Sequence, residues 1–151
     1  MYSGFELFEH ETVAPGREEY LNSEKYEYRP RDFDAQPNLN LLMGTLNSIR
    51  HAHPALQQLR QLHFHQATHD AVMAYSKRDG DDVVIVICSL DPDNTVESDV
   101  YLDMAALGLG DAESVDLRDE LTGATFTWGT RNYGRLSPGA PAHVLHVRSS
   151  F

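Results

Sequence analysis

Closely spaced histidines are the first residues in this chain that could do chemistry. The chain has eight histidines; His51 and His53 flank one residue, as do His63 and His65. On a strand, residues two apart lie on one face, so each pair could offer two imidazoles to a metal ion. Zinc needs three or four ligands, and the sequence has no cysteine pair and no HExxH motif to supply the others. We therefore expect no metal site and interpret these residues as solvent-facing strand histidines.

Other catalytic motifs are equally weak. The sequence has no GxSxG motif, and the glycines at 108–110 are not followed by the further glycine and the helix of a phosphate cradle. The acidic groups Asp79, Asp81 and Asp82, and Asp91 and Asp93, fall in predicted hairpin turns without the later Gly and Glu of a calcium loop. We interpret them as turn-forming, solubilising residues. The sequence predicts no catalytic residue and no cofactor in this chain.

One N-terminal segment has a composition that fits a ligand. Residues 22–32, NSEKYEYRPRD, interleave tyrosines with acidic and basic groups. Tyrosine rings can stack on sugar rings, and lysine or carboxylate groups can hydrogen-bond hydroxyls, so a polyhydroxylated ligand would suit this segment. A domain-boundary loop held by salt bridges and aromatic packing explains the same composition equally well. Residues 1–36 as a whole show no period but are rich in aromatics, so we expect them to be ordered by something against which they pack.

A helix must follow this segment. Leu42, Leu46 and Ile49 lie at helical spacing and predict an amphipathic helix from Asn38 or Leu39 to about His53. Asn38 is the expected N-cap, and Pro54 interrupts the pattern. Such an apolar stripe needs a sheet or neighbouring helices to cover it.

The rest of the chain is predicted to be β-structure. Beyond residue 60 the apolar period becomes two, with Leu62 and Phe64 alternating with histidines, and turn signals recur about every 8–12 residues. The unbroken run DVVIVICSL predicts a central strand covered on both faces, with Cys88 as a core residue. Seven or eight short strands are expected, and they predict an antiparallel β-sandwich, so the fold class is mainly β.

Length and charge bound the function. The chain has 151 residues, and its 12 basic and 23 acidic residues give a net charge of −11. This excess of acid argues against binding to nucleic acid or to anionic membranes. No stretch approaches the roughly 18 apolar residues needed to span a bilayer, and the N-terminus lacks the pattern of a signal peptide. We therefore expect a cytoplasmic location.

Several motifs, in order along the chain, closely resemble one enzyme family. YSGFELFEH, NSEKYEYRPRD and LNSIRHAHPALQQL are similar to the end of the catalytic barrel in bacterial maltosyltransferases of the α-amylase superfamily. The motifs FHQATHDAVMAYSKR, VVIVICSLDPDN, LDMAALGL, ELTGATFTWGTRNYGRL and PAHVLHVR extend the resemblance over almost the whole chain. This family transfers maltosyl units, with retention, from maltose 1-phosphate to α-1,4-glucan.

The resemblance implies a division of the chain and a set of contacts. Residues 1–58 would be the C-terminal end of a (β/α)8 barrel, comprising the exit loop of its last strand and its final helix, and residues 59–151 the C-terminal β-sandwich domain. The catalytic carboxylates would lie upstream, so this chain alone would be inactive although the parent is a glycosyltransferase. Lys25, then Tyr26 and Glu24, would contact the maltosyl group. The partners would be maltose 1-phosphate and α-1,4-glucan, and the resemblance allows a homodimer of the full enzyme.

Two questions stay open at the level of sequence. Met1 falls where a barrel strand would be finishing, which fits a truncated reading frame, an internal residue of a longer protein, or a stand-alone product. The alternative functions are a glucan-binding module that uses Trp128 and Tyr133 as a stacking platform, and a structural β-sandwich module without a ligand. For a truncated chain, the stripe formed by Leu42, Leu46 and Ile49 would leave apolar surface exposed.

Overall fold

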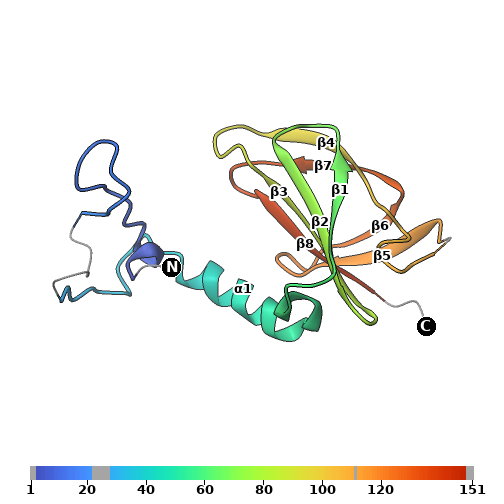
Figure 1. Cartoon of the computed structure of the whole chain (residues 1–151), viewed down its shortest axis with the longest axis horizontal. Coiled ribbons are helices and arrows are strands. Elements are labelled where there is room, and N and C mark those ends of the chain that lie inside the picture. Colours follow the sequence, from blue (N-terminus) through green and yellow to red (C-terminus); the bar gives the residue numbers. More distant parts are fainter. Residues whose placement is uncertain (1–2, 22–27, 111, 149–151) are drawn as a thin grey trace. The chain divides into compact units, whose positions relative to one another are not determined.

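The computed structural model describes residues 3–21, 28–110 and 112–148, and the chain forms two compact units, Met1–Asn47 and Ser48–Phe151. The first unit holds the 3-10 helix η1 (Phe5–Leu7) and most of the helix α1 (Asn40–Ala52), which ends in the second unit (Figure 1). The 3-10 helix η2 (Pro54–Gln57) then leads to the strands. No helix among the described residues is both long and apolar enough to cross a membrane. The predicted boundary at residues 58/59 stays a prediction.

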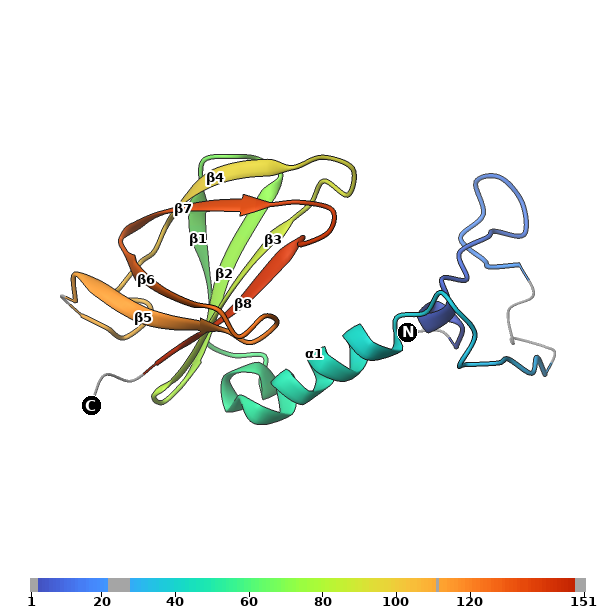
Figure 2. The same cartoon turned by 180° about the vertical axis from the view of Figure 1, so that it is seen from behind.

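Antiparallel strands make up the second unit. The described strands are β1 (Leu62–Ala67), β2 (Val72–Asp79), β3 (Asp82–Ser89), β4 (Val96–Tyr101), β5 (Ser114–Asp119), β6 (Thr125–Gly129), β7 (Arg131–Leu136) and β8 (Ala142–Val147). They form one sheet in the order β6-β5-β8-β3-β2-β1-β4-β7. The sheet curls, so its two edge strands β6 and β7 approach each other (Figures 1 and 2). The predicted mainly β, antiparallel fold class is confirmed, and the layers of the sandwich are parts of one continuous sheet.

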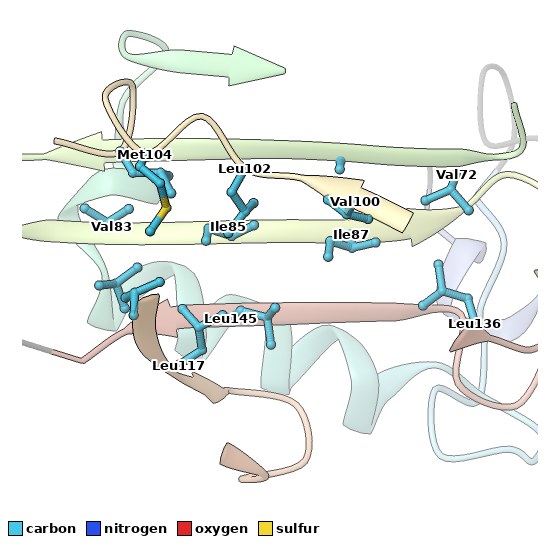
Figure 3. Close-up of a cluster of buried hydrophobic side chains, with 14 of the residues drawn as sticks. Val72, Val83, Ile85, Ile87, Val100, Leu102, Met104, Leu117, Leu136 and Leu145 are labelled. Atoms are coloured by element: carbon cyan, nitrogen blue, oxygen red, sulfur yellow. The ribbon is translucent and has the colours of Figure 1, made fainter. Parts of the chain in front are cut away.

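Strand β3 lies in the middle of this sheet, between β8 and β2, as the run DVVIVICSL predicts. Ile85 and Ile87 enter the main core with residues of β4, β5 and β8 (Figure 3). Val84 points to the opposite face, where it packs with Ile49 of α1 and Val144 of β8. Both faces of β3 are therefore covered near its middle, and this burial is the main source of stability for such a strand. Cys88 is only half-buried, so its prediction as a core residue is wrong.

Helix α1 begins and ends close to where its sequence predicts. The Asn38 side-chain oxygen accepts a hydrogen bond from the backbone N–H of Asn40 at 3.1 Å. The first helical hydrogen bond, however, is accepted by the carbonyl of Leu39, so Asn38 lies one residue before the N-cap position that was predicted for it. Pro54 begins η2 directly after the helix. Along the predicted stripe only Ile49 is buried, whereas Leu42 and Leu46 are exposed.

Strand β1 presents the opposite face from the one predicted. Leu62 and Phe64 are exposed, whereas His65 is buried. Strand β1 lies between β2 and β4, pairing with β2 over Leu62–His65 and with β4 over Gln66–Ala67. Ala67 packs against the main core. Because alternate residues share a face of a strand, His65 enters the interior with Ala67.

Candidate functional site

Hydrogen bonds hold the chain on the N-terminal side of residues 22–27, where the predicted sugar contacts lie. Glu24, Lys25 and Tyr26 themselves lie outside the described residues. On the N-terminal side of residues 22–27, Val13 N–H donates to the carbonyl of Glu19 at 2.9 Å, and Leu21 N–H donates to the carbonyl of Glu11 at 2.7 Å. These two hydrogen bonds close a hairpin-like loop that ends at Leu21, directly before the segment.

On the C-terminal side of residues 22–27, ion pairs with Glu9 hold Arg29 and Arg31. Arg31 Nε donates to both carboxylate oxygens of Glu9, at 3.1 and 3.2 Å, and Arg29 approaches the same carboxylate at 3.5 Å. The hydrogen bond from Arg31 is the main cause of the lowered pKa of Glu9. Gly4, with φ of +97°, lies beside this ion pair, and a Cβ at this position would collide with the carboxylate of Glu9. Salt bridges of this kind also fit the other interpretation of this segment, a domain-boundary loop without a ligand. The ligand contacts of residues 24–26 therefore stay predictions.

An aromatic cavity of about 210 Å³ lies inside the curled sheet of the second unit. Phe126 and Trp128 of β6 and Tyr133 of β7 line it. Trp128 also packs against the main core, whereas Tyr133 is 61% exposed. The two residues proposed as a stacking platform therefore differ, since Trp128 forms a wall of the cavity and Tyr133 stands at its rim.

Beside this cavity lies a buried carboxylate. Asp119 is fully buried and accepts hydrogen bonds from His143 Nδ1 at 2.9 Å and from the Thr122 hydroxyl at 2.9 Å. The backbone N–H groups of Leu121 and Val144 also donate to it. Burial alone would raise the pKa of Asp119, but the hydrogen bonds led by that from His143 hold it below its usual value. This network fixes the turn between β5 and β6.

The paired histidines separate into buried and exposed members. His51 and His63 are exposed, as predicted, but His53 and His65 are buried, so the prediction of solvent-facing side chains is wrong for these two. His65 Nδ1 accepts a hydrogen bond from the backbone N–H of Asp103 at 3.2 Å. Burial, then the charge of His63, lower the pKa of His65 to about 4. His65 is thus a neutral core residue at neutral pH.

A further polar cluster joins residues that are distant in sequence. His53 Nδ1 lies 2.8 Å from Asp82 Oδ1, and His146 Nε2 lies 3.4 Å from the same oxygen. Glu120 stands close to both imidazoles. The interpretation of Asp82 as a turn-forming, solubilising residue is wrong, because its carboxylate also accepts the backbone N–H of Ala55 at 2.8 Å. No local pattern in the sequence pairs His53 with the distant His146.

Comparisons with known proteins agree on one family. The family model described as "GLGE, C-terminal" matches residues 64–147. An α-1,4-glucan:maltose-1-phosphate maltosyltransferase of Streptomyces coelicolor is 52% identical over 153 residues, covering 98% of this chain and 23% of that protein. The enzyme of the same name from Mycobacterium tuberculosis strain H37Rv is 48% identical over 154 residues, covering 97% of this chain and 22% of that protein. The chain therefore spans less than a quarter of the length of these relatives.

Solved structures show the same fold. A maltogenic α-amylase from Thermotoga neapolitana matches with a TM-score of 0.61 at 11% identity, over 82% of this chain and 29% of that one. An α-amylase from Geobacillus thermoleovorans, in complex with acarbose, matches with a TM-score of 0.59 at 18% identity, over 82% of this chain and 26% of that one. At these identities the likeness concerns the fold alone.

Proposed function

Because this chain belongs to the family described as "GLGE, C-terminal", we propose that it is the C-terminal part of an enzyme that transfers maltosyl units from maltose 1-phosphate to α-1,4-glucan, with retention. The observation that carries this proposal is 52% identity to a relative of that name over 98% of the chain. In this proposal the parent protein is a glycosyltransferase. Its nucleophile and general acid lie in the part of the relatives that this chain does not span.

Two parts of the chain have different roles in this proposal. Residues 1–58 complete the catalytic barrel, and residues 59–151 form the C-terminal β-sandwich domain. The first unit exposes many large apolar side chains, and such surface is usually covered by other protein. The exposed residues include Phe5, Phe8, Phe33, Leu41, Leu42 and Leu46.

The loop around residues 22–27 supplies the donor contacts in this proposal. Lys25, with Tyr26 and Glu24, contacts the maltosyl group at the catalytic face of the barrel. Support comes from the frame around the segment, in which Leu21 before it and Arg31 after it are held by hydrogen bonds. Hydrogen bonds that hold the two ends of a loop reduce the entropy lost when a ligand binds to it.

Kinetics of the full-length parent enzyme test the donor contacts. Lys25→Ala is expected to lower kcat/KM for maltose 1-phosphate by roughly 10- to 100-fold, the effect of losing one charged hydrogen bond. Arg17→Ala is the matched control, because Arg17 is an exposed cation in the hairpin-like loop just before this segment, and it should leave the kinetics unchanged. Unchanged kinetics in Lys25→Ala would contradict the contact. Phosphate release from maltose 1-phosphate by the 151-residue chain alone would contradict the location of the catalytic carboxylates.

The partners and location follow from the same proposal. Maltose 1-phosphate and α-1,4-glucan bind the full enzyme, and a homodimer is its expected assembly. The reaction belongs in the cytoplasm, because a phosphorylated disaccharide is charged and does not cross a bilayer unaided. Size-exclusion chromatography with light scattering on the full-length enzyme tests the dimer, which a monomeric mass would contradict.

A second candidate function is glucan binding by the aromatic cavity. Exposed Tyr133 beside the cavity wall formed by Trp128 favours it, because sugar rings stack on such faces. Trp128 is the single tryptophan of the chain, so its fluorescence reports directly on occupancy. Titration with maltoheptaose should change this fluorescence in the wild type but not in Tyr133→Ala. Phe64→Ala, an equally exposed aromatic on β1, should behave as the wild type, and a flat titration of the wild type would exclude this candidate.

A further inference from the structure

The second unit carries a group of ligand atoms on the outer face of its sheet. One ligand atom each from His53, Glu120 and His146 lies within 4.8 Å of the other two. His146 on β8 pairs in register with Val84 of β3 and with Arg118 of β5. Asp82 precedes Val84 by two residues and therefore shares its face. His53 reaches this face from the junction of α1 and η2, so the cluster joins segments from separate parts of the chain.

Asp82 prepares His53 to act as a ligand. A carboxylate can only accept, so the 2.8 Å contact between His53 Nδ1 and Asp82 Oδ1 places the proton of the neutral imidazole on Nδ1. The lone pair of Nε2 is then available to a metal ion. Asp82 is itself held by the backbone N–H of Ala55 at 2.8 Å. A carboxylate behind a histidine in this way fixes the ring and increases its basicity toward a metal ion.

His146 is suited to the same task. Its imidazole stands with its centroid 4.4 Å from that of His53. Its Nε2 atom lies 3.4 Å from the Asp82 oxygen that also contacts His53, so the same carboxylate helps to hold both rings in place. Two imidazoles and one carboxylate form the three-ligand set of many zinc sites.

We propose that His53, His146 and Glu120 bind a zinc ion, with Asp82 orienting His53 and a water molecule as fourth ligand. Ligand atoms about 2.0–2.1 Å from a tetrahedral ion are roughly 3.3 Å apart. The three ligand atoms lie within 4.8 Å of one another, so small rotations of the side chains would bring them to this spacing. Glu120 now pairs with Arg118 at 3.3 Å. Arg118 is half-exposed, and breaking an exposed ion pair of this kind costs little free energy.

The expected consequence is structural and does not depend on the proposed function. A bound ion would connect the junction of α1 and η2 to β8 and to the turn that follows β5. Since an ion that binds only the folded state stabilises it, zinc should raise the Tm of the chain. The three ligands are brought together only by the fold, so the unfolded chain offers no equivalent site.

Zinc titration of the full 151-residue chain tests this proposal. Protein stripped with a chelator is titrated with Zn²⁺ in competition with a chromophoric chelator. The wild type should bind one equivalent and show a higher Tm with zinc. Co²⁺ in place of zinc should give the intense visible absorption of four-coordinate cobalt. His146→Gln and Glu120→Gln should each weaken zinc binding at least tenfold, and Glu120→Gln serves as the readout if the histidine variant fails to fold.

His63→Gln is the matched control. His63 is an exposed strand histidine with a carboxylate neighbour, Asp103, at 3.4 Å, but it lies outside the proposed site. Its variant should bind zinc as the wild type does. The proposal is overturned by a wild type that binds no zinc, by equal affinity in wild type and Glu120→Gln, or by loss of binding in His63→Gln.

Discussion

Asp119 Oδ2 accepts a hydrogen bond from His143 Nδ1 at 2.9 Å, although no part of Asp119 is exposed to solvent. A buried carboxylate is costly unless hydrogen bonds replace its water. The hydroxyl of Thr122 and the N–H groups of Leu121 and Val144 complete that replacement. Asp119 therefore holds the end of β5, the following turn and the start of β8 together.

Removal of this carboxylate should destabilise the chain strongly. Asp119→Ala leaves several buried donors without an acceptor, and we expect a loss of about 3–5 kcal/mol in the free energy of unfolding, measured by urea titration. Asp116→Ala is the control on the same strand, because Asp116 is exposed and its side chain bonds only to Thr127 among the hydrogen bonds described. It should cost less than about 1 kcal/mol. Equal effects of the two substitutions would contradict the assigned role of Asp119.

Local patterns in the sequence were sufficient to predict the helix α1 and the strands of this fold. Alternating apolar residues and turn residues such as Gly80, at φ of +61° between β2 and β3, predict the strands and their boundaries. Asn38 and Pro54 predict both ends of α1. These signals act within a few residues of the structure that they determine, which is why they can be read without knowing the tertiary fold.

The side-chain clusters could not be predicted in the same way. The interior position of His65 depends on which face of β1 packs against the core, and distant strands decide that. Contacts such as His53 with Asp82 and Glu9 with Arg31 likewise join residues far apart in sequence. For Lys25 the predicted role comes from family resemblance, because composition alone fits a ligand site and a salt-bridged loop equally well.

The buried His65 should make stability depend on pH. Its pKa falls from 6.5 to about 4 on folding, so between these values the unfolded state binds more protons. Stability is then full above about pH 6.5 and is lost as the pH falls toward 4, by up to about 3 kcal/mol. Urea titrations at pH 7.5 and 4.5 measure this loss.

A variant isolates the contribution of His65 from those of the carboxylates. His65→Asn keeps an acceptor near the Nδ1 position for the N–H of Asp103 but does not titrate. Its free energy of unfolding should fall less than that of the wild type between pH 7.5 and 4.5. His63→Asn removes only the second cause of the lowered pKa of His65 and should therefore reduce the pH dependence less than His65→Asn does. Identical profiles for wild type and His65→Asn would exclude His65 as the cause.

The packing of the end of α1 on the sheet should depend on one buried apolar residue, Ile49. Ile49 is 7% exposed and packs with Val84 and Val144 on the outer face of the sheet. Ile49→Ala removes this packing and should cost about 2–4 kcal/mol in thermal or urea unfolding. Leu41→Ala on the same helix removes a side chain that is 85% exposed and should change stability by less than about 0.5 kcal/mol. A larger loss from Leu41→Ala than from Ile49→Ala would contradict this description.

Trypsin should report on the ion pair between Glu9 and Arg31. The Arg31 side chain is 4% exposed and donates to Glu9, whereas Arg17 lies in an exposed turn. Because a protease must bind the arginine side chain and the extended backbone around it, we expect cleavage after Arg17 before cleavage after Arg31. Glu9→Gln removes the charge that holds Arg31 and should accelerate cleavage after Arg31 several-fold, with the rate after Arg17 as the internal control. Mass spectrometry of timed digests distinguishes the two sites, and a rate after Arg31 that does not respond to Glu9→Gln would show that the ion pair does not hold this part of the loop.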